Sequence, residues 1–113
     1  MADHIKISPA GGSVTVTAGG TILGTTTRAL EMREGSHAPV LYIPRADIDM
    51  TRLDKTPRST RCPWKGEASY YSIRSDAGLL ENAVWSYETP LEGVADIAGH
   101  LAFYPDKVTL TRQ

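Results

Sequence analysis

The chain has 113 residues and a formal net charge of −1, with 41% hydrophobic and 22% charged residues. This composition suits one globular domain over residues 1–113, and it provides no overall basic field for a nucleic-acid partner. A single cysteine excludes an internal disulfide, and without a long apolar run or a signal-peptide core we expect no membrane partner and a cytoplasmic location.

Alternating polar and apolar residues, separated by turns rich in Gly and Pro, recur along the whole chain. They predict strands at residues 4–8, 13–17, 21–27, 40–43, 68–74, 80–87, 100–104 and 108–111. Gly24, within the third segment, indicates a β-bulge. The turn at residues 105–107 has the Pro-Asp sequence that is typical of a type I turn.

The remaining segments are less regular. Residues 28–33 predict either one helical turn or a continuation of the preceding strand, because they are too short for an independent helix. Residues 46–53 and 90–93 can hold short helical turns, and the polar residues 54–59, which include Pro57, predict a loop. The pattern as a whole predicts a mainly β, compact single domain, either a β-sandwich or a partly open barrel, with one or two short helical turns.

Residues 60–71 hold the only cysteine, Cys62, next to a proline, a tryptophan and a lysine. The cations at positions 61 and 65 would favour a reactive thiolate, whereas free cysteine is more often a small buried hydrophobic residue. Because no histidine lies near Cys62 in the sequence, we weigh a structural role above a nucleophilic one.

Two cations are candidates for orienting an anionic ligand. Lys65 precedes Gly66 and Arg45 follows Pro44, so the backbone beside each side chain is constrained. A cation held among aromatic residues suits a carboxylate or phosphate group. The alternatives are solvent-exposed charge for Lys65 and an ion pair with Asp47 for Arg45.

Aromatic residues are the third candidate group. Tyr42, Trp64, Tyr70 and Trp85 would wall a cavity if neighbouring strands bring them together. Tyr and Trp have polar tips that need a partner or water, so a cluster rich in them suggests a cavity mouth, although packing in the core is the simpler interpretation. His100 comes directly before a predicted strand, which could place it near this cluster.

Asp47 and Asp49 place two carboxylates two residues apart, after an earlier Gly12-Ser13 pair. Nucleotidyltransferases use a related arrangement to hold Mg²⁺, but the separation along this chain is too long for that motif, and no P-loop is present. We therefore expect no metal ligands and no cofactor.

Several segments resemble, in the same order, the motifs of one family. They are residues 42–44, 60–70, 83–87, 97–100 and 102–108. From about residue 14 to residue 108 the chain is similar to domain-of-unknown-function family 427, which is sometimes labelled nucleotidyltransferase. The resemblance implies a compact β-tent-like domain without zinc cysteines and implies no established activity. Many relatives carry histidine just before the cysteine, where this chain has Arg61.

We expect a small soluble β domain that binds a small anionic ligand around the Cys-Pro-Trp-Lys-Gly segment. The candidate site residues are Cys62, Lys65, Arg45, Tyr42, Trp64, Tyr70, Trp85 and His100. One alternative is an interaction module that accepts a peptide, or a second copy of the chain as a homodimer. A Mg²⁺-dependent nucleotidyltransferase is the least favoured alternative, and whether the protein is an enzyme stays open.

Overall fold

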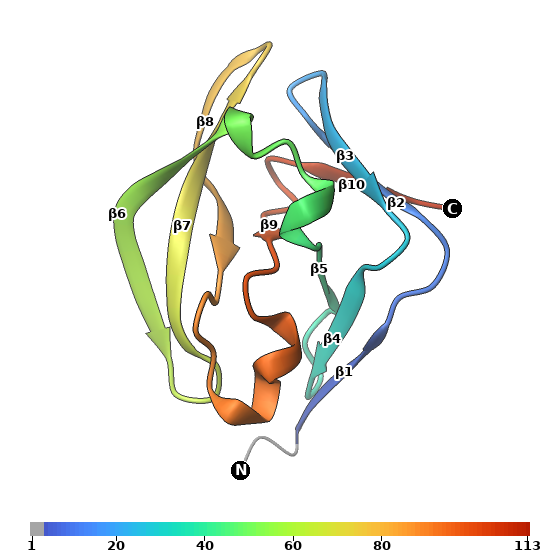
Figure 1. Cartoon of the computed structure of the whole chain (residues 1–113), viewed down its shortest axis with the longest axis vertical. Coiled ribbons are helices and arrows are strands. Elements are labelled where there is room, and N and C mark those ends of the chain that lie inside the picture. The colour runs from blue at the N-terminus through green and yellow to red at the C-terminus, as the bar shows by residue number, and fades with distance from the viewer. Residues whose placement is uncertain (1–3) are drawn as a thin grey trace.

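Ten strands form three antiparallel sheets in the computed structural model, which describes residues 4–113 (Figure 1). The first sheet has the order β1-β4-β5, with bounds Ile5–Pro9, Leu30–Glu34 and Val40–Tyr42. The second has the order β10-β2-β3, with bounds Thr109–Arg112, Val14–Ala18 and Thr21–Thr26. The third has the order β6-β7-β8-β9, with bounds Leu53–Cys62, Gly66–Ser75, Gly78–Ser86 and Ala102–Phe103.

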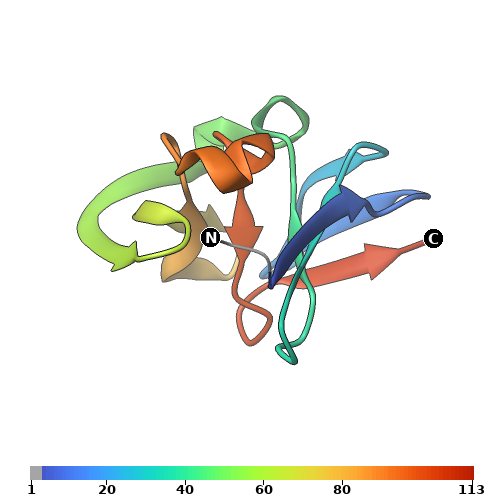
Figure 2. The same ribbon diagram turned by 90° about the horizontal axis from the view of Figure 1, so that it is seen from below.

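The helical segments are three short 3-10 turns: η1 (Arg45–Asp47), η2 (Met50–Arg52) and η3 (Glu92–Ile97). In Figure 1 the third sheet lies on one side, the other two sheets lie opposite, and η3 sits between them at the lower end. The view from below in Figure 2 shows the same separation between the curved third sheet and the other two. The mainly β prediction is confirmed, with three sheets and no closed barrel in the described part of the chain.

Two hydrophobic clusters fill the space between the sheets. The first joins the second and third sheets through residues such as Val16, Ile73 and Val84. The second joins the first and third sheets through residues such as Met32 and Tyr70 and includes the buried side of η3. The third sheet therefore contributes residues to both clusters.

A single backbone pair links the first and third sheets. Ile43 and Leu101 exchange two hydrogen bonds of 2.8 Å, and this bridge stands outside the named strands. No ladder continues from the bridge within residues 4–113. The cavity described below lies between these two sheets.

Several predicted elements need correction. Residues 54–59 are not a loop but part of β6, where Pro57 falls at the register shift between Lys55 and Ser59. Proline is tolerated there because β6 is the outer strand of its sheet and the bulge needs no ladder hydrogen bond. The helical-turn interpretation of residues 28–33 is also wrong, because Leu30–Glu34 is the central strand of the first sheet.

Other local predictions are confirmed. The predicted helical turn at residues 46–53 corresponds to η1 and η2, and the bulge near Gly24 appears as a register shift between β2 and β3. Gly24 has a second role there, because a Cβ at this position would lie 1.9 Å from the carbonyl oxygen of Asp47. The absence of a side chain lets η1 pack directly on β3.

Candidate functional site

A cavity of about 220 Å³ lies between the first and third sheets. Its walls come from strands β4, β5, β7 and β8, from the turns after β4 and β6, and from the residues that follow β8 and β9. The lining residues are Met32, Glu34, His37, Ala38, Val40, Tyr42, Lys65, Tyr70, Trp85, Tyr87 and Tyr104. We call this space the aromatic cavity, because five of these residues are Tyr or Trp.

Contacts among the aromatic side chains hold the cavity wall in place. Trp85 Nε1 donates a hydrogen bond of 3.3 Å to Tyr42 Oη, and their rings meet edge to face. The Trp85 and Tyr104 rings are 4.6 Å apart between centroids. Burial raises the pKa of Tyr42 to about 12 and also raises the pKa of Tyr87, so both phenols stay protonated at neutral pH.

Lys65 and Glu34 form the charged end of the aromatic cavity. Lys65 Nζ lies 2.6 Å from Glu34 Oε1, and the two side chains are only 12% and 25% exposed. The same ammonium group is 5.9 Å from the ring centroid of Tyr87. The hydrogen bond from Lys65 lowers the pKa of Glu34, so the carboxylate is ionised and the pair has no net charge.

The turn between β6 and β7 aims Lys65 inward. Its backbone N–H donates to the carbonyl of Cys62 at 3.3 Å, and its carbonyl accepts from Leu91 N at 3.0 Å. Gly66 follows with φ of 107°, a left-handed conformation that favours glycine. Lys65 is thus neither solvent-exposed charge nor an unpaired cation.

The rest of the Cys-Pro-Trp-Lys-Gly segment points elsewhere. Cys62 is half-buried and packs against the second hydrophobic cluster, but it does not line the aromatic cavity. Trp64 is 41% exposed, and its ring meets that of His4 edge to face at 5.1 Å. Only Lys65 of this segment therefore reaches the cavity.

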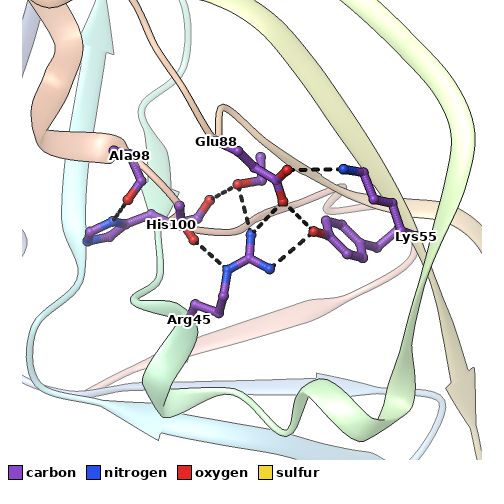
Figure 3. Close-up of polar contacts among 8 residues, drawn as sticks. Arg45, Lys55, Glu88, Ala98 and His100 are labelled. Carbon is purple, nitrogen blue, oxygen red and sulfur yellow. Dashed lines mark hydrogen bonds and ion pairs between the residues drawn. The ribbon is translucent and has the colours of Figure 1, made fainter.

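Arg45 lies in a different polar cluster, at the centre of Figure 3. Its guanidinium group donates to the Gly99 carbonyl, Tyr71 Oη and a carboxylate oxygen of Glu88, each at 3.1 Å. Lys55 donates to the other oxygen of Glu88 at 3.1 Å, and Tyr71 Oη also donates to this carboxylate. The hydrogen bond from Tyr71, together with Lys55 and Arg45, lowers the pKa of Glu88.

The predicted ion pair between Arg45 and Asp47 is wrong. Asp47 instead accepts from Thr26 Oγ1 at 2.7 Å and from Arg28 Nη2 at 3.1 Å. The Arg45 cluster ties η1 to β7 and β8, and its hydrogen-bonding groups are used within the cluster. The Arg45 cluster therefore stabilises the packing of η1 against these two strands.

His100 belongs with the Arg45 cluster and not with the aromatic cavity. Its Nδ1 lies 3.2 Å from the Ala98 carbonyl, as Figure 3 shows, and its own carbonyl accepts from Ser86 Oγ at 2.7 Å. The structure therefore brings together Tyr42, Lys65, Tyr70 and Trp85, and it places Arg45 and His100 in another cluster.

Sequence reasoning missed Glu34, which is the partner of Lys65. The two residues are separated by 31 positions, and a glutamate near the end of a strand gives no sign of its distant partner. Tyr87 and Tyr104 could have been found, because Tyr87 lies two residues after Trp85 and Tyr104 directly follows Phe103, each just beyond a strand.

No group of three or more His, Cys, Asp or Glu side chains is placed to hold a metal ion among residues 4–113. The Asp49 carboxylate is bonded to the N–H and hydroxyl groups of Thr51, away from the Asp47 contacts. None of the helical segments within the described part of the chain is long and apolar enough to cross a membrane.

Comparison with known proteins gives one family. The model of a family described as a domain of unknown function (DUF427) matches residues 6–113, nearly the whole chain. A search of curated proteins gave no match.

Proposed function

The chain belongs to the domain of unknown function (DUF427) family, and we propose that it binds a small molecule with a flat ring and one acidic group in the aromatic cavity. The observation that carries this proposal is a space of about 220 Å³ that is lined largely by Tyr and Trp and has one ion pair at its end. Apolar cavities of roughly 150 Å³ hold benzene, so this space has room for a ring with a substituent.

The ion pair limits the charge of the ligand. An ammonium group has three N–H donors, and Lys65 gives one to Glu34. An acidic group on the ligand can accept a second N–H, while the Glu34 carboxylate repels further negative charge. A singly charged acid therefore suits the site better than a polyphosphate.

A thermal-shift screen of small aromatic acids tests the proposal. A ligand at 100 times its Kd stabilises the folded state by about 2.7 kcal/mol, so a true hit raises Tm. Trp85→Phe, which removes the indole from the wall, should abolish the shift. Trp64→Phe is the matched control, because this exposed tryptophan lies outside the cavity. Equal shifts in both variants, or no hits at all, would contradict the proposal.

An assay of pyrophosphate release, with nucleotides and Mg²⁺ added to the protein, tests the nucleotidyltransferase alternative. Pyrophosphate release that requires Mg²⁺ and is lost in Asp47→Asn would support transfer chemistry. We expect no release, because the Asp47 and Asp49 carboxylates are bonded to separate partners.

A second candidate function, binding of an extended apolar peptide, is favoured by a groove of about 440 Å³. It runs beside β5 and β10, which are the outer strands of their sheets. The groove is lined by Ala38, Pro39, Val40, Leu41, Trp85, Phe103, Pro105, Val108, Thr109 and Leu110. Outer strands can pair with a peptide backbone while apolar pockets accept its side chains.

A short peptide of alternating Val and Thr is a suitable probe for the groove. Leu41→Lys should abolish binding measured by fluorescence anisotropy, whereas Leu79→Lys, at an exposed position outside the groove, should not. A mass that rises with protein concentration in sedimentation would show instead that a second copy of the chain occupies this face.

A further inference from the structure

Four cations have no carboxylate partner within the part of the chain that the structure describes: Lys6, Arg58, Arg61 and Lys107. Two of them, Arg58 and Lys107, line one surface hollow of about 540 Å³. The cations that sequence reasoning favoured, Lys65 and Arg45, are both ion-paired. The positive charges of Arg58 and Lys107 are therefore unpaired, and they lie beside the aromatic cavity and not inside it.

Aromatic rings hold these two cations in place without neutralising them. The guanidinium carbon of Arg58 lies 4.8 Å from the ring centroid of Tyr70. Lys107 Nζ lies 5.9 Å from the ring centroid of Tyr104 and donates to the Glu81 carbonyl at 2.9 Å. Cation–π contact orients a charged group but leaves its remaining N–H donors free for a ligand.

Asn82 adds a third donor in an unusual backbone conformation. Its φ of 49° is the only positive φ at a non-glycine residue in the described chain, and it falls where the β7–β8 register shifts. Its Oδ1 accepts from Thr56 Oγ1 at 2.7 Å, and its backbone N–H donates to Ser72 Oγ at 3.0 Å. The Nδ2 group donates no hydrogen bond to residues 4–113 and belongs to a residue that lines the hollow. Unusual backbone conformations of this kind are concentrated at ligand sites.

We propose that this hollow binds a phosphate- or sulfate-type oxyanion through Arg58, Lys107 and the Asn82 amide. A guanidinium group matches the geometry of such oxygens, and Lys107 supplies a point charge beside it. Tyr104 also lines the hollow, and because burial raises its pKa to about 12 its hydroxyl is protonated at neutral pH.

Two carboxylates, Glu81 and Asp106, complete the lining. Neither is within ion-pair distance of Arg58 or Lys107 in the described structure, so they do not neutralise the cations directly. Their negative charge disfavours a polyanion and makes a single oxyanion the better fit.

The test is an NMR titration of the protein with inorganic phosphate at constant ionic strength. We expect the side-chain signals of Arg58 and Asn82 to shift with saturation. Arg58→Gln should weaken binding about threefold to tenfold, the range for one exposed charge-assisted contact. Asp106→Asn should strengthen it, because it removes a repelling charge.

Arg61→Gln is the matched control. It removes the same charge from an exposed, unpaired arginine of the same strand, which lies outside the hollow. Equal weakening in Arg61→Gln and Arg58→Gln, or equal shifts with chloride, would overturn the proposal in favour of general charge attraction. Trp85→Phe should leave phosphate binding unchanged, so this result is independent of whether the aromatic cavity takes a ligand.

Discussion

The Lys65–Glu34 pair is the residue-scale feature on which the aromatic cavity depends. Both side chains are largely buried, and each is the other's main charged partner. Removing one partner of such a pair leaves a partly buried charge without compensation, which costs more than the pair contributes on balance. The pair therefore has a structural role as well as any role in binding.

We predict that Lys65→Met lowers the free energy of unfolding by about 1–3 kcal/mol, because the Glu34 carboxylate loses its hydrogen-bond donor. Urea denaturation at neutral pH measures this difference. Arg61→Met, which removes an exposed cation, is the control and should leave the urea midpoint nearly unchanged. If the two substitutions have equal effects, the ion pair does not stabilise the fold.

The pH dependence of stability gives an independent test of the same pair. The pKa of Glu34 is lowered in the folded protein from the ordinary value of 4.5. Its contribution is therefore complete above pH 4.5 and is lost as the pH falls through the lowered folded-state pKa. We expect the stability difference between wild type and Glu34→Gln to shrink with acidification and to disappear in strong acid. A constant difference at all pH values would contradict this.

Four of the eight residues predicted for the site line the aromatic cavity. Tyr70 and Trp85 could be grouped because they face each other on the neighbouring strands β7 and β8, whereas Tyr42 comes from another sheet. The acidic partners of Arg45 and Lys65 could not be predicted, because they are 43 and 31 residues away in the sequence. A cation's role depends on which carboxylate the fold brings to it, and local spacing carries no information on that.

At the scale of elements, the close contact of β3 with η1 depends on one missing side chain. A Cβ on Gly24 would lie 1.9 Å from the Asp47 carbonyl oxygen, which is backbone and cannot rotate away. We predict that Gly24→Ala destabilises the protein by roughly 1–3 kcal/mol, the usual cost of overpacking. Thr25→Ala, at the next and exposed position, is the control in the same urea experiment. Equal midpoints for the two variants would show that η1 shifts away from the added methyl group without a loss of stability.

The elements themselves were predicted unevenly. The hairpin of β7 and β8 has clear alternation and a Gly-containing turn, so it was predicted almost to its ends. β6 was missed because its outward-facing residues are polar and because Pro57 falls at a bulge. An outer strand needs neither continuous hydrophobicity nor an unbroken ladder, and its composition therefore resembles that of a loop.

At the scale of the whole molecule, the third sheet contributes to both hydrophobic clusters. Neither of the other sheets can bury its apolar face without it. We predict a single cooperative unfolding transition, in which far-UV circular dichroism and tryptophan fluorescence give the same midpoint in urea. Two separate midpoints would indicate that the clusters unfold independently.

Substitution at the bridge between the first and third sheets should strongly lower the stability measured in that unfolding transition. Ile43 is fully buried and exchanges both backbone hydrogen bonds with Leu101. We expect Ile43→Ala to lower the free energy of unfolding by about 2–4 kcal/mol through the space that it leaves. Ile22→Ala, at a position that is 66% exposed, is the matched control and should have little effect. A similar loss in both would exclude a special role for the bridge.

Tyr104 lines both the aromatic cavity and the neighbouring polar hollow. Two weak chemical fragments, one in each space, would therefore share the Tyr104 phenol ring as part of their walls. Joining them with a short covalent tether would turn the second binding event into an intramolecular one, with an effective concentration in the millimolar range or above. This geometry makes the domain a suitable starting point for fragment linking.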